Sequence, residues 1–344
     1  MDPRGTTLGV AHYSSSSLIT LRMLTSYAGV QAGGLRHRIE AAIAHRGLVV
    51  RDSSAYRVVS SEGDLLPGLI VDRYSDYLVM QTLTQGMDRA KSEIVEALNE
   101  RLQPRGILAR NDAAVRKLEE LPLETTVVSG EIPELVAIEM NGLKLEADLL
   151  RGQKTGIYLD QRENYVAAAK YARGRVLDCF TSTGGFALHA ARAAESVEAV
   201  DSSPHALAQA EANARANGIA NVQFRQADLF EFLAGVERQY SMIVLDPPAF
   251  AKSRKSLSDA ERGYKDINLR ALKLLEPGGI LVTCSCSHHV SEAMLHAIVA
   301  EAALDAGKTL RVLERRTQAA DHPILLTVPE TLYLKCLILE AVAI

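Results

Sequence analysis

The chain has 344 residues, of which 47% are hydrophobic and 23% are charged. This composition supports a buried core and excludes a disordered or low-complexity chain. The formal net charge of −4 excludes a positive field over the whole molecule, so a nucleic acid would have to meet a local basic patch. Because single domains usually have roughly 100–200 residues, more than one folding unit is expected.

The cysteines and the apolar runs indicate a cellular compartment. Cys179, Cys284, Cys286 and Cys336 lack the paired spacing of a zinc site, and they lie in apolar surroundings. This is typical of reduced thiols in a cytosol. No apolar run reaches the roughly 18 residues of a spanning helix, and the N-terminus lacks the order of a signal peptide. We expect a cytoplasmic protein with no membrane partner and no metal.

The first part of the chain carries strand and helix signals in a mixed order. Residues 1–34 include an alternating stretch at 17–24 that indicates one or two strands, too few to be stable alone. Residues 35–150 predict an α+β domain. Its strands are expected at 56–60, 69–72, 77–83, 106–109 and 143–149, and its helix at 88–102.

From residue 175 the pattern changes to strand, turn and helix in repetition. Such βαβ units predict a doubly wound α/β domain around a mostly parallel sheet, which we place at residues 151–344. The strands are expected at 176–180, 197–201, 222–224, 242–245 and 280–284, and helices at 204–217 and 292–305.

The turn after the first of these strands predicts the kind of ligand. Ligands bind at the carboxyl ends of strands in such sheets, and here Asp178 is followed by Gly184 and Gly185. The spacing is not the G-x-G-x-x-G of dinucleotide enzymes, and a carboxylate there repels phosphate. S-adenosylmethionine, with its ammonium and sulfonium groups, fits both conditions.

Further carboxylates follow the next two strands. Asp201 is placed to accept both ribose hydroxyls, and Asp228 to accept from an adenine amino group. Each alone could equally be a loop carboxylate or a helix cap. Three carboxylates at consecutive strand ends, after a glycine-rich turn, favour a cofactor site.

The ends of the fourth and fifth strands carry candidate substrate chemistry. Asp246-Pro247-Pro248-Ala249-Phe250 predicts a rigid wall against a planar substrate. A thiolate at Cys286 could add to carbon 6 of a pyrimidine and activate carbon 5. Strand alternation places Cys284 on the same face, and each thiol could instead be a small buried apolar group.

Several strings together resemble the bacterial large-subunit (23S) ribosomal RNA cytosine-C5 methyltransferase family. They are KTGIYLDQR at 154–162, the turn at 178–185, DPPAF at 246–250, RGYKDIN at 262–268, CSCS at 284–287, and the closing strings at 318–323 and 329–335. The match spans about residues 50–344. It implies an N-terminal PUA RNA-binding domain, a central α+β domain, and a Rossmann-like class I methyltransferase domain with a seven-stranded sheet.

The resemblance also implies roles for individual residues. Cys286 would be the nucleophile, and Asp246 would support the pyrimidine edge. The cofactor S-adenosyl-L-methionine would meet Lys154, Tyr158, Asp160, Arg162, Asp178, Phe180, Thr183, Gly184, Gly185, Asp201, Ser202, Asp228, Leu229 and Asp246. The RNA would meet Pro247, Pro248, Phe250, Lys252, Arg262, Tyr264, Lys265 and His322.

This sequence departs from the family pattern at two places. Residues 6–24 resemble only the last strands of a PUA domain, so residues 1–34 are expected to be its remnant. Many RNA cytosine-C5 methyltransferases carry a second cysteine after the paired prolines, where this chain has Ala249. The base that removes the C5 proton is therefore not identified, and Asp246 is a candidate for it.

The expected substrate is RNA whose target base is single-stranded or flipped out, since a stacked base cannot reach a thiolate and a methyl donor. Phosphate contacts are expected from Lys252, Arg254, Lys255, Arg262 and Lys265, which could instead form a solvated loop. The string at 152–156 lacks the full phosphate-loop motif, which excludes nucleotide hydrolysis.

Two other functions and a quaternary state stay open. Methylation of an exocyclic nitrogen could use DPPAF without a thiol. A non-catalytic RNA-binding protein could retain the cofactor fold. A homodimer is compatible with the sequence, which carries no signal for or against it.

Overall fold

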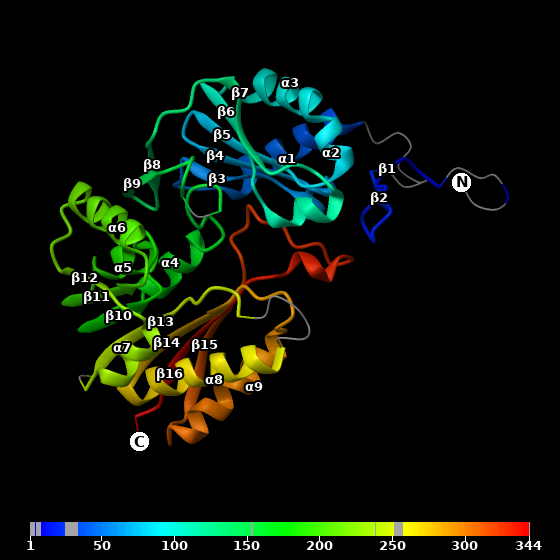
Figure 1. Cartoon of the computed structure of the whole chain (residues 1–344). Helices are drawn as coiled ribbons and strands as arrows, with labels where there is room; N and C mark the ends of the chain where they lie inside the picture. Colours follow the sequence, from blue (N-terminus) through cyan, green and yellow to red (C-terminus); the bar gives the residue numbers. More distant parts are fainter. Residues whose placement is uncertain are drawn as a thin grey trace. The chain divides into compact units, whose positions relative to one another are not determined.

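The computed structural model describes residues 4, 8–24, 34–152, 154–237, 239–250 and 257–343 (Figure 1). The chain forms two compact units. The N-terminal unit contains Met1–Leu159 and Ala320–Thr331, and the C-terminal unit contains Asp160–Ala319 and Leu332–Ile344. Within the described ranges, no helix is long and apolar enough to span a membrane.

The N-terminal unit is built on a five-stranded sheet of order β3-β4-β5-β6-β7, in which only β5 and β6 are parallel. Its strands are β3 (Ala55–Ser60), β4 (Leu69–Tyr74), β5 (Tyr77–Thr82), β6 (Gly106–Asn111) and β7 (Glu124–Gly130). Its helical segments are α1 (Leu35–Val49), η2 (Ser61–Asp64), α2 (Gln85–Arg89), α3 (Lys91–Leu102), η3 (Ala114–Glu119) and η5 (Pro329–Thr331).

Two small strand pairs complete this unit. β8 (Val136–Met140) and β9 (Leu143–Ala147) form a hairpin whose turn residues, Asn141 and Gly142, have φ of 53° and 72°. Both residues therefore adopt the left-handed conformation that a tight hairpin turn requires. The pair β1 (Ala11–Tyr13) and β2 (Leu21–Met23) is antiparallel, and the apolar side chains around it are largely exposed.

The C-terminal unit is built on a seven-stranded sheet of order β12-β11-β10-β13-β14-β16-β15. Its strands are β10 (Arg175–Cys179), β11 (Ser196–Asp201), β12 (Val222–Gln226), β13 (Tyr240–Leu245), β14 (Leu275–Ser285), β15 (Leu310–Arg316) and β16 (Lys335–Ala341). The first five strands in chain order are parallel, and β16 is antiparallel to both its neighbours. The strand order reverses direction between β10 and β13, so ligands are expected at their carboxyl ends.

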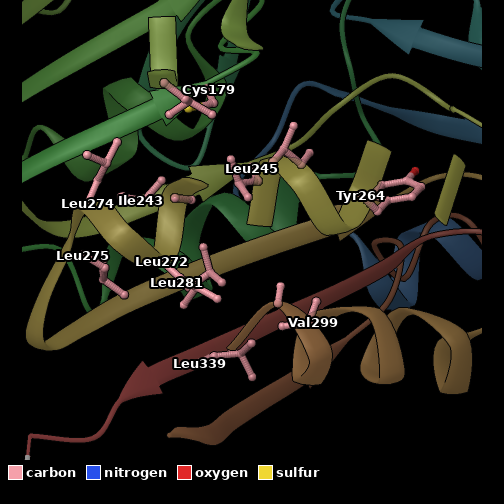
Figure 2. Close-up of a cluster of buried hydrophobic side chains, with 14 of the residues drawn as sticks. Cys179, Ile243, Leu245, Tyr264, Leu272, Leu274, Leu275, Leu281, Val299 and Leu339 are labelled. Carbon is pink, nitrogen blue, oxygen red and sulfur yellow. The ribbon is translucent and has the colours of Figure 1, made fainter. Parts of the chain in front are cut away.

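The helices of this unit are α4 (Arg162–Ala169), α5 (Gly185–Ala190), α6 (Pro204–Ala216), α7 (Leu229–Gly235), α8 (Leu257–Leu274) and α9 (Glu292–Asp305). Side chains of α7, α8 and α9 form one apolar cluster with β10, β13, β14 and β16 (Figure 2). Alternation along β10 directs Leu177 and Cys179 into this cluster. The side chain of Asp178 therefore lies on the other face, where it meets α5.

The expected fold class is confirmed, and the strands expected between residues 176 and 284 are present with shifts of a few residues. The helix expected at 88–102 is divided into α2 and α3, because the side chain of Thr84 caps a separate short helix by accepting from the Met87 amide. In the alternating stretch at 17–24, only Leu21–Met23 forms a strand.

The units divide the chain differently from the expected boundary at 150. Residues up to Leu159 belong to the N-terminal unit, where the Thr155 hydroxyl bonds the Tyr74 hydroxyl at 2.9 Å and the Asp72 carboxylate at 2.6 Å. The segment Ala320–Thr331 also belongs there, because Arg57 N donates to the Asp321 carboxylate at 2.8 Å. The C-terminal unit is therefore not continuous in sequence.

Candidate functional site

The turn after β10 has an unusual backbone. Phe180, Ser182 and Gly184 have φ of 62°, 50° and 89°, all in the left-handed region. For residues other than glycine this conformation is uncommon and costs free energy, and it clusters at ligand sites. A Cβ on Gly185 would lie 2.4 Å from the ring of Tyr165, so only glycine fits there. The turn at the carboxyl end of β10 therefore combines a left-handed backbone with tight packing against Tyr165.

Asp178 is the central carboxylate of this turn. Its Oδ2 atom accepts from the Thr181 hydroxyl at 2.6 Å and the Ala187 amide at 2.9 Å. Its Oδ1 atom is buried and has no hydrogen-bond partner among the described residues. Burial raises the pKa of Asp178 from 3.8 to about 7, and the charges of Asp246 and Asp201 contribute to the increase. A cation that bonded Oδ1 would offset this cost.

The next two carboxylates bind backbone N–H groups. Asp201 accepts from the Ser182 amide at 2.9 Å and the Ser203 amide at 2.9 Å, so it ties the end of β11 to the turn after β10. Asp228 is exposed and caps α7 through Oδ1, which accepts from the Phe230 and Glu231 amides. The cap interpretation of Asp228 is thus correct, and Oδ2 has no hydrogen-bond donor among the described residues.

Asp246, directly after β13, is held by a chain of side chains that sequence reasoning did not identify. The Gln161 amide nitrogen donates to Asp246 Oδ1 at 3.0 Å. Asn164 donates to the Gln161 amide oxygen at 2.7 Å, and Arg316 donates to the Asn164 amide oxygen at 2.9 Å. Each bond fixes the orientation of the next amide, so Asp246 meets an N–H group. Gln161 is part of the KTGIYLDQR string, which was the available signal.

Cys286 directly follows β14 and is partly exposed, whereas Cys284 is fully buried. Cys286 lies between Ser285 and Ser287, and we call these three residues the Cys286 segment. The Tyr264 hydroxyl bonds the Ser285 hydroxyl at 2.9 Å and the Ser287 hydroxyl at 3.1 Å. The structure thus places the two thiols in different environments. Only the thiol after the strand end is accessible to a substrate.

Aromatic rings lie beside the paired prolines. Pro247 is buried and Pro248 is exposed. The ring of Phe250 lies 4.7 Å from the ring of Tyr264 and 6.3 Å from that of Phe230, measured between centroids. Tyr264 itself is fully buried, and its hydroxyl bonds Ser285 and Ser287 on either side of Cys286. Its expected contact with RNA stays a prediction.

The expected basic cluster is not supported by the residues that are described. Lys265 forms ion pairs with Glu301 at 3.2 Å and Asp305 at 3.0 Å, and Arg262 pairs with Asp259. Arg262 is therefore paired with a carboxylate of its own helix, α8, and Lys265 with two carboxylates of α9. Lys252, Arg254 and Lys255 lie outside the described residues.

His322 is buried in the N-terminal unit, and its Nδ1 atom lies 3.1 Å from the Asp321 carboxylate. The Asp321 backbone oxygen in turn accepts from the buried Arg46 at 2.8 Å. The His322 ring is therefore part of a buried polar network, and its expected contact with RNA stays a prediction.

The KTGIYLDQR string is divided between the two units. Lys154 and Tyr158 belong to the N-terminal unit, where the Lys154 ammonium lies 4.5 Å from the Tyr158 ring centroid. Asp160 and Arg162 are buried in the C-terminal unit, where Asp160 accepts from the Tyr333 hydroxyl at 2.8 Å.

The remaining expected cofactor residues lie at strand ends of the C-terminal unit. Thr183 follows β10, and its carbonyl accepts from Asn213 at 3.2 Å. Ser202 is exposed after β11, whereas the Leu229 side chain is buried in the core. The Leu229 side chain therefore packs against the sheet and leaves only its backbone for a ligand.

These side chains fit S-adenosylmethionine. Asp178, Asp201 and Asp246 lie at the carboxyl ends of neighbouring strands, and the charges of Asp201 and Asp246 disfavour the ionised form of Asp178 in the free protein. The unpartnered oxygen of Asp178 can accept from an ammonium group, and the accumulated negative charge suits a sulfonium ligand. Gly184 permits the left-handed backbone of this turn, and Gly185 leaves room for the ring of Tyr165.

Comparisons with known proteins agree with this fit. The sequence profile of the S-adenosylmethionine-dependent methyltransferase family matches residues 109–339. The chain is 43% identical to the ribosomal RNA large subunit methyltransferase I of Tolumonas auensis, over 99% of this chain and 89% of that protein. It is 47% identical to the protein of the same name from Aeromonas hydrophila, over 86% of this chain and 77% of that protein.

Solved structures share the fold. A SAM-dependent methyltransferase from Streptococcus mutans matches with a TM-score of 0.81 and 21% identity, over 97% of this chain and 88% of that one. A methyltransferase complexed with SAH matches equally well, with a TM-score of 0.81. From the profile, the relatives and the geometry at the ends of β10, β11 and β13, the chain belongs to the S-adenosylmethionine-dependent methyltransferase family, together with the curated ribosomal RNA large subunit methyltransferases I.

Proposed function

We propose that this enzyme methylates carbon 5 of a cytosine in large-subunit ribosomal RNA, with Cys286 as the nucleophile. The RNA class is supported by the names of relatives that are 43–47% identical over most of the chain. The observation that carries the chemistry is the position of Cys286. This partly exposed thiol directly follows β14, the neighbour of the β13 strand that ends at Asp246.

The thiol supplies what cytosine lacks. Carbon 5 of the ring is a weak nucleophile until the Cys286 thiolate adds to carbon 6 and moves electron density onto carbon 5. The bound cofactor supplies an electrophilic methyl group, and S-adenosylhomocysteine leaves. A base then removes the C5 proton, the C5–C6 double bond re-forms, and the thiolate is expelled. The enzyme is unchanged at the end of the cycle.

Other residues hold the reactants in this proposal. Asp178 would bind the cofactor ammonium through its Oδ1 atom, and Asp201 the ribose hydroxyls. Asp246 would accept a hydrogen bond from the amino edge of the pyrimidine, with its carboxylate oriented by Gln161. The base must be single-stranded or flipped out of a helix to reach these groups.

The test is methyl transfer from radiolabelled S-adenosylmethionine into unmodified ribosomal RNA, followed by nucleoside analysis. Wild type is compared with Cys286→Ala and with Cys179→Ala, which removes a thiol buried in the apolar cluster of Figure 2. We expect label in 5-methylcytidine that is lost only in Cys286→Ala. Label in an exocyclic nitrogen, or label that survives in Cys286→Ala, would overturn the thiolate mechanism. RNA binding without any label would favour a non-catalytic protein.

A further inference from the structure

A lysine is buried beside the Cys286 segment. Lys335 is the first residue of β16, and it is paired in register with Ser285 of β14. Only 4% of its surface is exposed. Its ammonium group donates to the Ser287 carbonyl at 2.7 Å and to the Tyr333 carbonyl at 2.9 Å. The ammonium is therefore bound to the residue that directly follows Cys286.

This ammonium has no carboxylate partner among the described residues, although most buried charges in proteins are paired. Two neutral carbonyls satisfy two of its three N–H groups, and the third has no acceptor in the described part of the chain. Burial lowers the pKa of Lys335 to about 8, and the nearby thiol of Cys286, when ionised, acts in the opposite direction. One N–H group of the ammonium is therefore left that an anion could accept from.

The segment around Cys286 is fixed on the other side by hydroxyl groups. The Tyr264 hydroxyl on α8 bonds both Ser285 and Ser287, the residues on either side of the cysteine. Burial raises the pKa of Tyr264, so this group stays neutral. The Cys286 segment is thus held between a neutral phenol on α8 and a cation on β16.

We infer that Lys335 is a positioning residue whose buried ammonium holds the Cys286 thiol in its ionised, nucleophilic form. This inference rests on the proposed function and names the group that activates its nucleophile. The thiol proton passes to solvent, and the thiolate and the ammonium stabilise each other. A cysteine next to a lysine ionises more readily than a free one.

The other titratable group near this pair does not supply the charge. His288 is stacked against Tyr333 at 5.6 Å between ring centroids. Burial and the charge of Lys335 lower the pKa of His288, so the imidazole is neutral at pH 7. Of Lys335 and His288, Lys335 is then the group that carries a positive charge near neutral pH.

The test is the pH dependence of Cys286 alkylation by iodoacetamide in the intact enzyme, followed by mass spectrometry of the Cys286 peptide. In wild type we expect the rate to reach half its maximum well below the pH at which an ordinary cysteine titrates. In Lys335→Met we expect about tenfold slower alkylation at pH 7 and an equal rate at high pH, because only the thiolate reacts. Lys335→Arg keeps the charge and should retain most of the reactivity.

Lys308→Met is the matched control. The Lys308 ammonium also donates to a β14 carbonyl, that of Leu275 at 2.8 Å, but at the opposite end of the strand. Its loss should leave the alkylation profile unchanged. A purely structural role for Lys335 predicts a lower thermal midpoint in Lys335→Met with an unshifted profile, and that result would overturn the inference.

The wild-type profile tests the inference even if Lys335→Met fails to fold. Titration of Cys286 like an ordinary cysteine would refute it. The alkylation requires neither RNA nor cofactor, so the measurement does not depend on whether the proposed function is correct. Loss of the thiolate mechanism would show as methyl transfer by Cys286→Ala, whatever the alkylation profile. The two failures are therefore distinguishable.

Discussion

Replacing Asp178 by Asn is expected to stabilise the free enzyme and to weaken cofactor binding. The Asn oxygen can still accept from Thr181 and Ala187, as Oδ2 does now, while its NH₂ group takes the place of the buried, unpartnered Oδ1 atom. The substitution removes a charge that the free protein buries at a cost, and that charge is what a cationic cofactor would bind.

The magnitude follows from the pKa. Folding raises the pKa of Asp178 from 3.8 to about 7, so the protonated form is favoured in the folded state. This preference stabilises the protein fully below about pH 4 and is lost as the pH rises towards 7. The advantage of Asp178→Asn should therefore grow from about 2 kcal/mol at pH 5 to about 4 kcal/mol at pH 8.

Urea denaturation of the cofactor-free enzymes at pH 5 and pH 8 measures this advantage, and calorimetric titration with S-adenosylmethionine measures the affinity. We expect Asp178→Asn to bind about 100-fold more weakly at pH 8. In wild type, the affinity should fall about tenfold per pH unit below 7, because the carboxyl must then lose a proton to bind the ammonium. An equal advantage at both pH values would refute the reasoning.

Asp201→Asn serves as the control for this experiment. Both oxygens of Asp201 accept from backbone amides, so an Asn there replaces one acceptor by a donor. We expect a loss of stability of about 1 kcal/mol or more at either pH.

Three further changes test other parts of the structure. Gly185→Ala places a Cβ 2.4 Å from the ring of Tyr165, so we expect the free energy of unfolding, measured in urea, to fall by about 1–3 kcal/mol. Gln161→Glu keeps the acceptor for its neighbour but sets a carboxylate against Asp246, and kcat for methyl transfer should fall at least about tenfold with the RNA and cofactor saturating. Arg46→Met leaves a buried carboxylate unpaired in the N-terminal unit and should cost about 3–5 kcal/mol.

Each of these changes has an outcome that would contradict it. A Gly185→Ala enzyme as stable as wild type would show that the turn and the ring move apart freely. For Gln161, unaltered kcat in the Glu variant would mean that Asp246 needs no orienting N–H group. If Arg46→Met lowered the binding free energy of the cofactor as much as the free energy of unfolding, the N-terminal unit would do more than maintain its own fold.

Most of the parallel strands could be predicted because they are rich in apolar residues and end at a polar turn. β12, with the sequence VQFRQ, is the exception. The pattern of β10, with Asp178 between Leu177 and Cys179, also predicts that the carboxylate faces away from the apolar cluster. Such local periodicity reports burial and direction. It indicates which carboxylates lie at strand ends, and the structure places Asp178, Asp201 and Asp228 at or just after the ends of β10, β11 and β12.

Partners distant in sequence could not be predicted in this way. Lys265 looked like an available cation, but its partners Glu301 and Asp305 come from the next helix along the chain. His322 looked like a substrate contact, but Asp321 is held by Arg46 and Arg57, which lie more than 250 residues earlier. Periodicity carries no information on such pairings, because they depend on how the elements pack.

The sequence also contained signals for residues whose roles depend on neighbours. Tyr264 belongs to a string with family character, yet only packing shows that its hydroxyl holds the serines beside Cys286. Lys335 ends the closing string at 329–335, and its charge gains a role only when β16 pairs with β14.

The discontinuity of the two units has a consequence for synthesis of the chain. Proteins emerge from the ribosome N-terminus first, and domains generally fold as they become complete. Here the N-terminal unit waits for Ala320–Thr331 while the whole of residues 160–319 is made. The C-terminal unit in turn waits for β16, the strand between β14 and β15. Both units are therefore completed only after residue 320 has been made, and a chain arrested before that residue would finish neither.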